Sequence, residues 1–339
     1  MARDRVLITG ISGFIAKHTA LQFLEAGYAV RGTVRDAKKG DDVAGTLSKY
    51  TDISKLEFAE ADLLDDSGWD KAMAGCDCVA HMASPFPLAQ PKDENELIRP
   101  AVEGTLRVLK AAADAGVERF VQTSSSVAVI YGHPHSKTRF DETDWTNVQN
   151  PEVTPYQKSK TLAEKAARDF VAEQGGNMHY ASVNPGLVLG PPLDSRFGSS
   201  LEVIRMLLAG KYPGAPKLKI QVVDVRDIAR MHLLAMETSQ PSGGRYLGIT
   251  DNIWMLDMAN MLRDGLGDKA RKAPKRELPN FMVKLVALFD GAARSVLPEL
   301  GLDKRIDNSH TRAELAIDFI PADEAVVTAG KALIDMKAV

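Results

Sequence analysis

Cysteine is nearly absent from this sequence, which holds only Cys76 and Cys78 among its 339 residues. Two cysteines with a single residue between them have poor geometry for a disulfide with each other. A chain without disulfides is typical of a reducing compartment, and we therefore predict a cytoplasmic location. Cys78 lies in an apolar run, which favours a buried side chain over a reactive or metal-binding thiol.

The sequence also lacks a large excess of charge of one sign and long apolar runs. The net charge is −3, without the basic excess typical of proteins that bind nucleic acid or anionic membranes. No apolar run approaches the ~20 residues that cross a bilayer, and polar residues 1–5 lead directly into a strand pattern rather than a secretory signal. We expect neither a nucleic-acid nor a membrane partner. His133 and His135 have no third ligand at a useful spacing, so no metal is expected either.

Short apolar runs alternate with helical patterns through the first half of the chain. This alternation is typical of right-handed βαβ units, and it predicts a parallel sheet with helices on both faces. The expected strands are residues 6–8, 29–34, 56–61, 78–82, 120–122 and 180–183, and the expected helices are 14–26, 97–113 and one from Pro155 to Gly175.

The pattern changes after residue 184. Residues 185–220 are rich in proline and glycine around a helical stretch at 201–208, and residues 251–339 are mostly helical. Residues 220–236 read as a short strand, a turn and a helix that return to the main sheet. The predicted fold class is α/β, a Rossmann-type doubly wound parallel sheet with a smaller, mixed C-terminal domain. The larger domain is expected to comprise residues 1–184 and 221–250, and the smaller one residues 185–220 and 251–339.

Two glycines, Gly10 and Gly13, stand between the first predicted strand and the first predicted helix. Gly10 can form a tight turn, while Ser12 and Gly13 let a pyrophosphate approach the backbone closely. The free N–H groups and positive dipole end of the helix would then meet the phosphates. With Ala16 the pattern is G-x-x-G-x-x-A. The strand before it and the helix after it favour a nucleotide site over a purely structural turn.

The second predicted strand ends in Arg35 and Asp36, which indicate different cofactors. An acidic residue at this position accepts hydrogen bonds from the ribose of NAD, whereas a guanidinium meets the 2′-phosphate of NADP. Lys38 and Lys39 add positive charge that NAD does not require. We therefore predict NADP(H). The alternative is a solvated basic loop in which Asp36 caps the next helix.

Tyr156 and Lys160 are four residues apart in a helical pattern, so they share one helix face. An ammonium beside a phenol favours the phenolate and brings its pKa down from ~10, which suits proton transfer to a carbonyl oxygen. Residues 123–126, Thr-Ser-Ser-Ser, end a predicted strand at the sheet edge where α/β proteins bind ligands. Their hydroxyls could hold that oxygen. The alternatives are a solvated helix face and serines that simply end a strand.

With these residues, the chain resembles the extended short-chain dehydrogenases/reductases, in the branch that holds dihydroflavonol reductases, cinnamoyl-CoA reductases and fungal carbonyl reductases. The matching segments follow the family's order over about residues 5–237 and match weakly beyond them. They include TGISGFIAKH, GTVRD, RFVQTSSSVAV, YQKSKTLAEKAA, VNPGLVLGPP and VDVRDIARMHLLAME.

The resemblance implies a role for each matching residue. Tyr156 would be the proton donor, Lys160 would tune it and hold the nicotinamide ribose, and Ser125 would bind the carbonyl, with Ser124 and Ser126 as alternatives. The smaller domain would bind the substrate. The implied NADP(H) contacts are Gly10, Ser12, Gly13, Phe14 and Ile15 at the pyrophosphate, Arg35 and Lys39 at the 2′-phosphate, Asp62 and Leu63 at the adenine, Ala83 and Ser84 near the ribose, and Pro185 and Val188 at the nicotinamide.

The sequence departs from two branches of the family. Ile130 stands where plant dihydroflavonol reductases have an asparagine that holds the flavonoid, and TPYQKSK lacks the aromatic, cysteine-containing signature of cinnamoyl-CoA reductases. We therefore predict reversible, NADPH-dependent reduction of an aldehyde or ketone by a monomer or homodimer, with the substrate open.

Two alternatives share the scaffold. Nucleotide-sugar dehydratases resemble one another in a Thr-Asp-Glu run where this chain has Ser125-Ser126-Val127, and epimerases retain NAD, which Arg35 disfavours. A non-catalytic NADP sensor would often lack the tyrosine that is present here as Tyr156.

Overall fold

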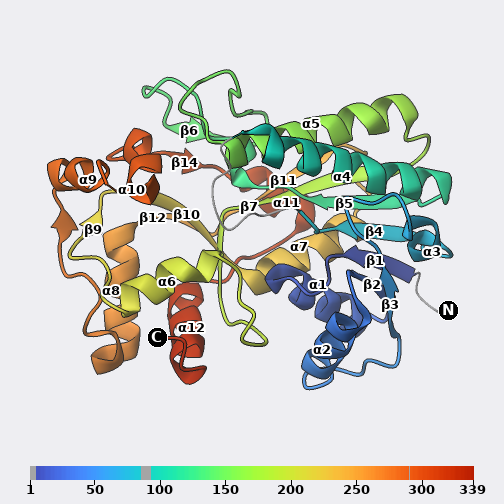
Figure 1. Ribbon diagram of the computed structural model, residues 1–339, viewed down its shortest axis with the longest axis horizontal. Coiled ribbons are helices and arrows are strands. Elements are labelled where there is room, and N and C mark those ends of the chain that lie inside the picture. Colours follow the sequence, from blue (N-terminus) through green and yellow to red (C-terminus); the bar gives the residue numbers. More distant parts are fainter. Residues whose placement is uncertain (1–4, 85–92, 290) are drawn as a thin grey trace.

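A parallel sheet of seven strands runs through the larger part of the molecule (Figure 1). The computed structural model describes residues 5–84, 93–289 and 291–339, so most of the polar start lies outside the described residues. The strand order is β11-β7-β5-β4-β1-β2-β3, and each neighbouring pair is parallel. The strands are β1 (Arg5–Thr9), β2 (Ala29–Val34), β3 (Leu56–Glu60), β4 (Cys78–His81), β5 (Arg119–Thr123), β7 (His179–Pro185) and β11 (Gly244–Gly248).

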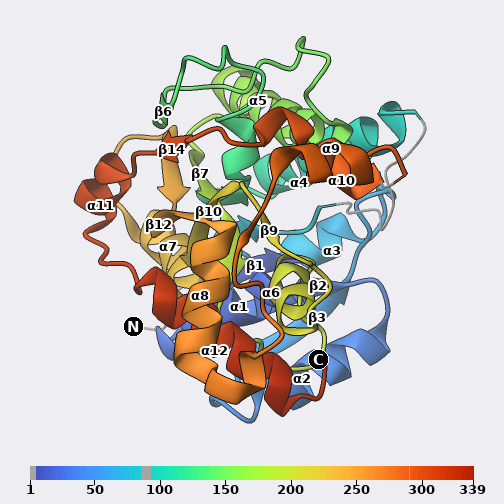
Figure 2. The same cartoon turned by 90° about the vertical axis from the view of Figure 1, so that its left-hand side faces the viewer.

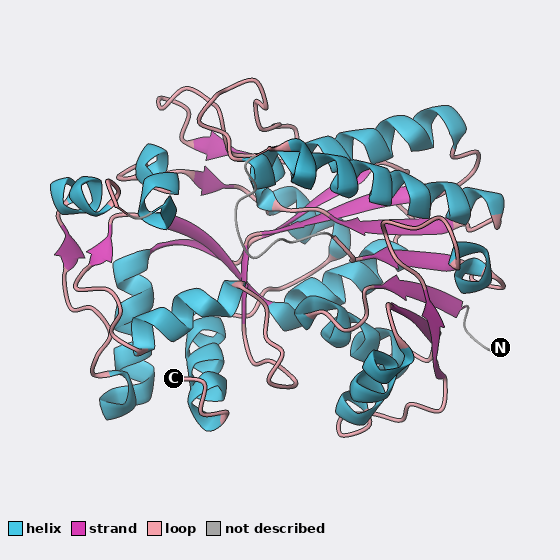
Figure 3. Ribbon diagram, viewed as in Figure 1, coloured by secondary structure: helices cyan, strands magenta, loops and turns pink. Residues whose placement is uncertain are grey.

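Helices cover both faces of this sheet (Figure 3). Strand residues alternate between the faces: Val6 and Ile8 join one hydrophobic cluster, while Leu7 joins another on the opposite side. The predicted doubly wound fold is confirmed, and the predicted strands and helices end within two residues of those observed. The first cluster includes α1 (Phe14–Glu25), α2 (Ala37–Leu47) and α7 (Val225–Glu237), and the second includes α3 (Trp69–Met73), α4 (Asn95–Asp114) and α5 (Pro155–Gln174).

A smaller mixed sheet of three strands stands beside the large one (Figure 2). Its central strand β10 (Lys219–Asp224) is parallel to β8 (Leu187–Leu189) and antiparallel to β12 (Asp251–Trp254). Around it lie α6 (Ser200–Leu208), α8 (Met255–Leu266) and α12 (Ala322–Asp335). The short pairs are β6 (Arg139–Phe140) with β14 (Arg305–Ile306) and β9 (Ala215–Pro216) with β13 (Glu277–Leu278); the remaining helices are η1 (Ser126–Ala128), η2 (Gly267–Ala270), α9 (Asn280–Val286), α10 (Gly291–Ser295), η3 (Leu297–Glu299) and α11 (Ser309–Leu315).

One sequence-based prediction about this region is wrong. Residues 220–224 lie in β10 (Lys219–Asp224), which pairs in the small sheet instead of returning to the large one. Gly186, the only residue between β7 and β8, allows the crossing, because a Cβ atom there would lie 2.3 Å from the carbonyl oxygen of Gln221. The chain does return to the large sheet later, through α7 and β11. The domain limits themselves stay a prediction.

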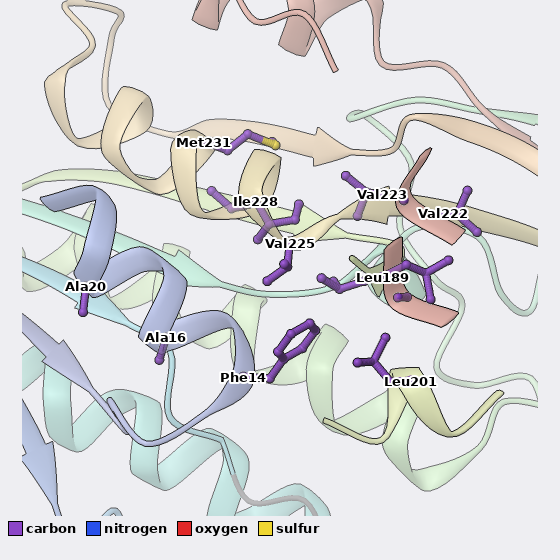
Figure 4. Close-up of a cluster of buried hydrophobic side chains, with 14 of the residues drawn as sticks. Phe14, Ala16, Ala20, Leu189, Leu201, Val222, Val223, Val225, Ile228 and Met231 are labelled. Carbon is purple, nitrogen blue, oxygen red and sulfur yellow. The ribbon is translucent and has the colours of Figure 1, made fainter. Parts of the chain in front are cut away.

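The two sheets share one hydrophobic core (Figure 4). Phe14 at the start of α1 lies near Leu201 of α6 and Leu189 of β8, and the same cluster continues through Val222 of β10 to α7. Among the described residues, no helix combines the length and apolarity needed to cross a bilayer.

The loop between β8 and α6 is fastened to α1 and α2. Lys17 is almost completely buried, and its ammonium lies 2.5 Å from the Asp194 carboxylate. The Thr46 hydroxyl donates to the same carboxylate at 3.1 Å, and the ring of His18 contacts the carbonyl oxygen of Pro191 at 3.0 Å. Charged and polar groups thus bind this loop to the large sheet's helices.

Candidate active site

The turn between β1 and α1 leads into a helix that begins without a side-chain cap. Gly10 has a φ of +64°, and a Cβ atom there would lie 3.0 Å from the Cβ of Ala83. The N–H of Gly13 donates to the carbonyl of Gly10 at 3.0 Å, and α1 then begins without a side-chain cap or an acidic residue in its first turn. The first amides of a helix need such partners, so this turn fits a pyrophosphate. Ser12 and Ile15 are partly exposed here, whereas the Phe14 side chain is buried in the core.

Thr9 and His81, which sequence reasoning missed, join the carboxyl ends of β1 and β4. The Thr9 hydroxyl lies 2.9 Å from the ring nitrogen Nδ1 of His81 and accepts the N–H groups of Met82 and Ala83 at 2.9 and 3.0 Å. Burial, with the nearby charge of Lys160, lowers the pKa of His81 to about 3, so the ring is neutral. These bonds hold Ala83 against the Gly10 turn, with Ser84 directly after it, at the edge where the strand order reverses.

A hollow of about 700 Å³ lies beyond the ends of β2 and β3. It brings together Arg35, which is exposed, and Asp62, as a site for the adenosine end of a dinucleotide requires. Leu63 is not among the lining residues; its side chain packs against Gly104 of α4. The remaining lining residues include Val34, Ala61 and Lys71.

Asp36 caps a helix. Its carboxylate accepts the N–H of Lys39 at 3.0 Å at the start of α2, and the ammonium of Lys39 lies 3.4 Å from the same carboxylate. The capping alternative is therefore confirmed for Asp36, while Arg35 keeps its place on the hollow.

Tyr156 and Lys160 lie on the first two turns of α5, whose start is fixed by a capping box. The Thr154 hydroxyl accepts the N–H of Gln157, and the Gln157 side chain accepts the N–H of Thr154 at 2.8 Å. Pro155 occupies the first helical turn, where its missing N–H costs nothing. The helix therefore begins at a fixed residue, which places the phenol and the amine one turn apart.

The structure brings Ser125 and Tyr156 together. Their hydroxyl groups are hydrogen-bonded, although the residues come from different elements. Ser125 precedes η1, and its hydroxyl also reaches the carbonyl oxygen of Pro185 at 3.5 Å. Ser124 instead donates to the buried carboxylate of Glu164 at 2.6 Å, and Ser126 lies in η1 with its side chain buried. This arrangement favours Ser125 over its two neighbours as the carbonyl-binding residue.

Burial dominates the protonation of the phenol and the amine. It raises the pKa of Tyr156, while the hydrogen bond from Ser125 acts in the opposite direction. The sequence predicts a lowered pKa for this phenol, and the structure differs because desolvation penalises the phenolate. Burial also lowers the pKa of Lys160 to about 8, opposed by the negative charge of Glu164. A protonated phenol one helical turn from a largely protonated amine suits donation of a proton to an oxygen.

Two further positions are buried in hydrophobic clusters. Val188 lies in the core on β8. Ile130 is buried in a cluster with Phe140 and Ile306. Neither Cys76 nor Cys78 forms a disulfide, and both are buried. In the described part of the chain, no three His, Cys, Asp or Glu side chains are placed to hold a metal ion.

Comparison with known proteins finds one matching family and relatives that are named as reductases. The sequence pattern of the NAD dependent epimerase/dehydratase family matches residues 6–247. The ketoreductase azaE of Aspergillus niger is 32% identical over 312 residues, which cover 86% of this chain and 92% of that protein. Dihydroflavonol 4-reductase of Zea mays is 32% identical over 268 residues, 77% of this chain and 74% of that protein. The crystal structure of Gre2 from Candida albicans in complex with NADPH is 26% identical, with a TM-score of 0.83 over 98% of this chain and 99% of that one.

Proposed function

Because this chain belongs to the NAD dependent epimerase/dehydratase family of extended short-chain dehydrogenases/reductases, we propose that it is an NADPH-dependent reductase of aldehydes or ketones, reversible toward alcohol oxidation. The observation that carries the proposal is the hydrogen-bonded pair of Ser125 and Tyr156, with Lys160 one turn further along α5, near the carboxyl ends of β5 and β7. The names of the relatives, a ketoreductase and a dihydroflavonol 4-reductase, support the same chemistry.

In the proposed reaction, bound NADPH supplies the hydride that reduces the carbonyl carbon. The Ser125 hydroxyl donates a hydrogen bond to the carbonyl oxygen and orients it. Tyr156 transfers its phenolic proton to that oxygen as negative charge develops there, which yields the alcohol. The ammonium of Lys160 stabilises the phenolate that remains on Tyr156. In the reverse direction the same phenolate accepts the alcohol proton.

The chain's own residues fit the cofactor. We propose that the uncapped start of α1 with Gly10, Ser12, Gly13 and Ile15 holds the pyrophosphate and that Arg35 binds the 2′-phosphate over the hollow that it shares with Asp62. Lys39 would contribute from α2 beside its partner Asp36. The proposed contacts of Phe14, Leu63 and Val188 are backbone contacts, since these side chains pack elsewhere. We also propose Ala83 and Ser84 as contacts near the ribose and Pro185 as a contact at the nicotinamide; the Thr9 hydroxyl holds Ala83, and the Ser125 hydroxyl reaches the carbonyl of Pro185.

Arg35→Ser is expected to raise the KM for NADPH by about 10- to 100-fold, because a hydrogen bond to a charged group contributes about 1.5–3 kcal/mol. The KM for NADH, which has no 2′-phosphate, should change little. Steady-state kinetics with both cofactors measure this split. Lys49→Ala is the matched control, since it removes an exposed positive charge just after α2, away from the hollow. A native KM for NADPH in Arg35→Ser would show that another group binds the phosphate.

A panel of small and aryl aldehydes and ketones, followed by the absorbance of NADPH, tests the function. We expect consumption of NADPH with formation of one alcohol enantiomer. NAD released from the purified protein on denaturation would instead indicate an epimerase. Tight NADPH binding with no turnover across the panel would indicate a non-catalytic sensor. Either result would overturn the reductase.

A further inference from the structure

Glu164 is a buried carboxylate one helical turn after Lys160 on α5. Its side chain is fully buried and contacts groups from three strands of the large sheet. Ser124, directly after β5, donates to it at 2.6 Å, and Arg245 of β11 donates at 2.7 Å. From β7, the Ser182 hydroxyl donates at 3.0 Å and the Asn184 amide at 2.7 Å. The carboxylate therefore joins the catalytic helix to the strands that end at the active site.

The same bonds reach Ser125. The side-chain amide of Asn184 donates both to Glu164 and, at 3.3 Å, to the backbone carbonyl of Ser125. Ser124, the preceding residue, is held by Glu164 directly. A change in the carboxylate would therefore shift the backbone that carries the carbonyl-binding hydroxyl. Glu164 acts here through other residues, without a contact to the reacting atoms.

Glu164 also carries charge toward Lys160. Burial alone would raise the pKa of Glu164, but Arg245 and Arg168 outweigh it and hold that pKa below its ordinary value. The ionised carboxylate in turn favours the protonated form of Lys160, against the desolvation that lowers its pKa. The other titratable groups nearby are neutral: His81 of β4, whose pKa burial lowers to about 3, and the phenols of Tyr156 and of Tyr180 of β7, whose pKa values burial raises.

We propose that Glu164 is a positioning residue for the reductase reaction: its carboxylate fixes the backbone of Ser125 through Asn184 and places a buried negative charge one helical turn from the ammonium of Lys160. The inference rests on the proposed function for its kinetic consequences. The protonation of Lys160 can be measured without any substrate, so the two ideas can fail separately.

The first measurement is the protonation midpoint of Lys160 in Glu164→Gln. Lysines are labelled with carbon-13 methyl groups, their NMR shifts are followed against pH, and Lys160→Met identifies the signal. We expect the native midpoint near 8 and a midpoint lower by about one pH unit or more in Glu164→Gln, since an opposite charge is lost and the charges of Arg168 and Arg245 are left uncompensated. An unchanged midpoint in a folded variant would overturn the electrostatic role.

The second measurement is the pH dependence of kcat for carbonyl reduction. Loss of the ammonium weakens Tyr156 as an acid, so the alkaline fall in kcat should move to lower pH by the same amount in Glu164→Gln. Ser182→Ala is the matched control, because it removes one hydrogen bond to Glu164 but no charge. It should leave the pH midpoint where it is in the native enzyme. An equal shift in both variants would indicate a general loosening of the fold and would overturn the proposal.

Glu164→Asp separates position from charge, and it keeps the test decisive if Glu164→Gln does not fold. The shorter carboxylate keeps its charge but cannot bond to β5, β7 and β11 together. We expect a near-native Lys160 midpoint with kcat lowered about tenfold or more, because small displacements of reacting groups are costly. A native kcat in Glu164→Asp would overturn the positioning role. If the Lys160 midpoint shifts in Glu164→Gln but the native protein reduces no carbonyl, only the proposed reductase function would be refuted.

Discussion

Replacement of Tyr156 by phenylalanine is expected to lower kcat for carbonyl reduction by about 10²- to 10⁴-fold, the usual contribution of a positioned general acid. The phenol is bonded to the Ser125 hydroxyl, and burial keeps it protonated. Phenylalanine retains the ring and its packing but has no proton to give. The dissociation constant for NADPH should change little, so the loss should appear in kcat.

Tyr131→Phe is the matched control for this experiment. Tyr131 is another phenol close to Tyr156; its side chain is partly buried, and its hydroxyl bonds to the side chain of Gln157. Removal of that hydroxyl leaves the Ser125–Tyr156 pair intact, so its effect on kcat should be far smaller. If Tyr156→Phe lost only a few-fold in turnover, the proposed proton donor would be refuted.

Arg245→Met is expected to lower the free energy of unfolding by about 3–5 kcal/mol, because removal of one partner leaves a buried charge uncompensated. Arg245 is 5% exposed; it donates to Glu164 and to the carbonyl oxygens of Ala128 and Glu142, and its guanidinium lies 3.7 Å from the centre of the Trp145 ring. Methionine can replace the packing of the stem but none of these hydrogen bonds. Urea denaturation of both proteins measures the difference.

The pH dependence of this loss has a definite sign. In the native chain the pKa of Glu164 is held below its ordinary value, so its contribution to stability is present at neutral pH and falls away in acid. Without Arg245, burial would raise the pKa of Glu164 above its unfolded value. Protonation of the buried carboxylate would then remove the uncompensated charge and stabilise the variant. The stability gap should therefore narrow as the pH falls from about 7 to about 5. Arg168→Met is the control: its side chain is 22% exposed, so its loss should be smaller. An equal loss in both variants would contradict the argument.

Local patterns in the sequence were enough for most of the large sheet. Its central strands β1 and β4 are almost entirely buried because helices cover both faces, and the capped start of α5 is visible as Thr154-Pro155. The place of β10 could not be read in the same way. Its residues resemble any buried strand, and its partner β12 lies after a helix and a further strand, so the choice of sheet depends on contacts that no local pattern records.

In the candidate site, too, local patterns predict some features and long-range contacts decide the others. Spacing and resemblance identify Tyr156, Lys160 and the serines as candidates. Only the fold decides that Ser125 bonds to Tyr156 while Ser124 bonds to Glu164. Glu164 was missed because a glutamate four residues before an arginine, Arg168, is typical of a solvated helix face. Its burial comes from β5, β7 and β11 together. Compartment, oligomeric state and the catalytic roles stay predictions.

The ion pair of Lys17 and Asp194 restricts opening motions of the molecule. To swing the loop after β8 away from α1 would strand an ammonium and a carboxylate where water reaches them poorly, which is costly. An opening motion that separates the loop after β8 from α1 is therefore disfavoured. We expect entry of substrate and release of product to depend on smaller rearrangements elsewhere in the molecule.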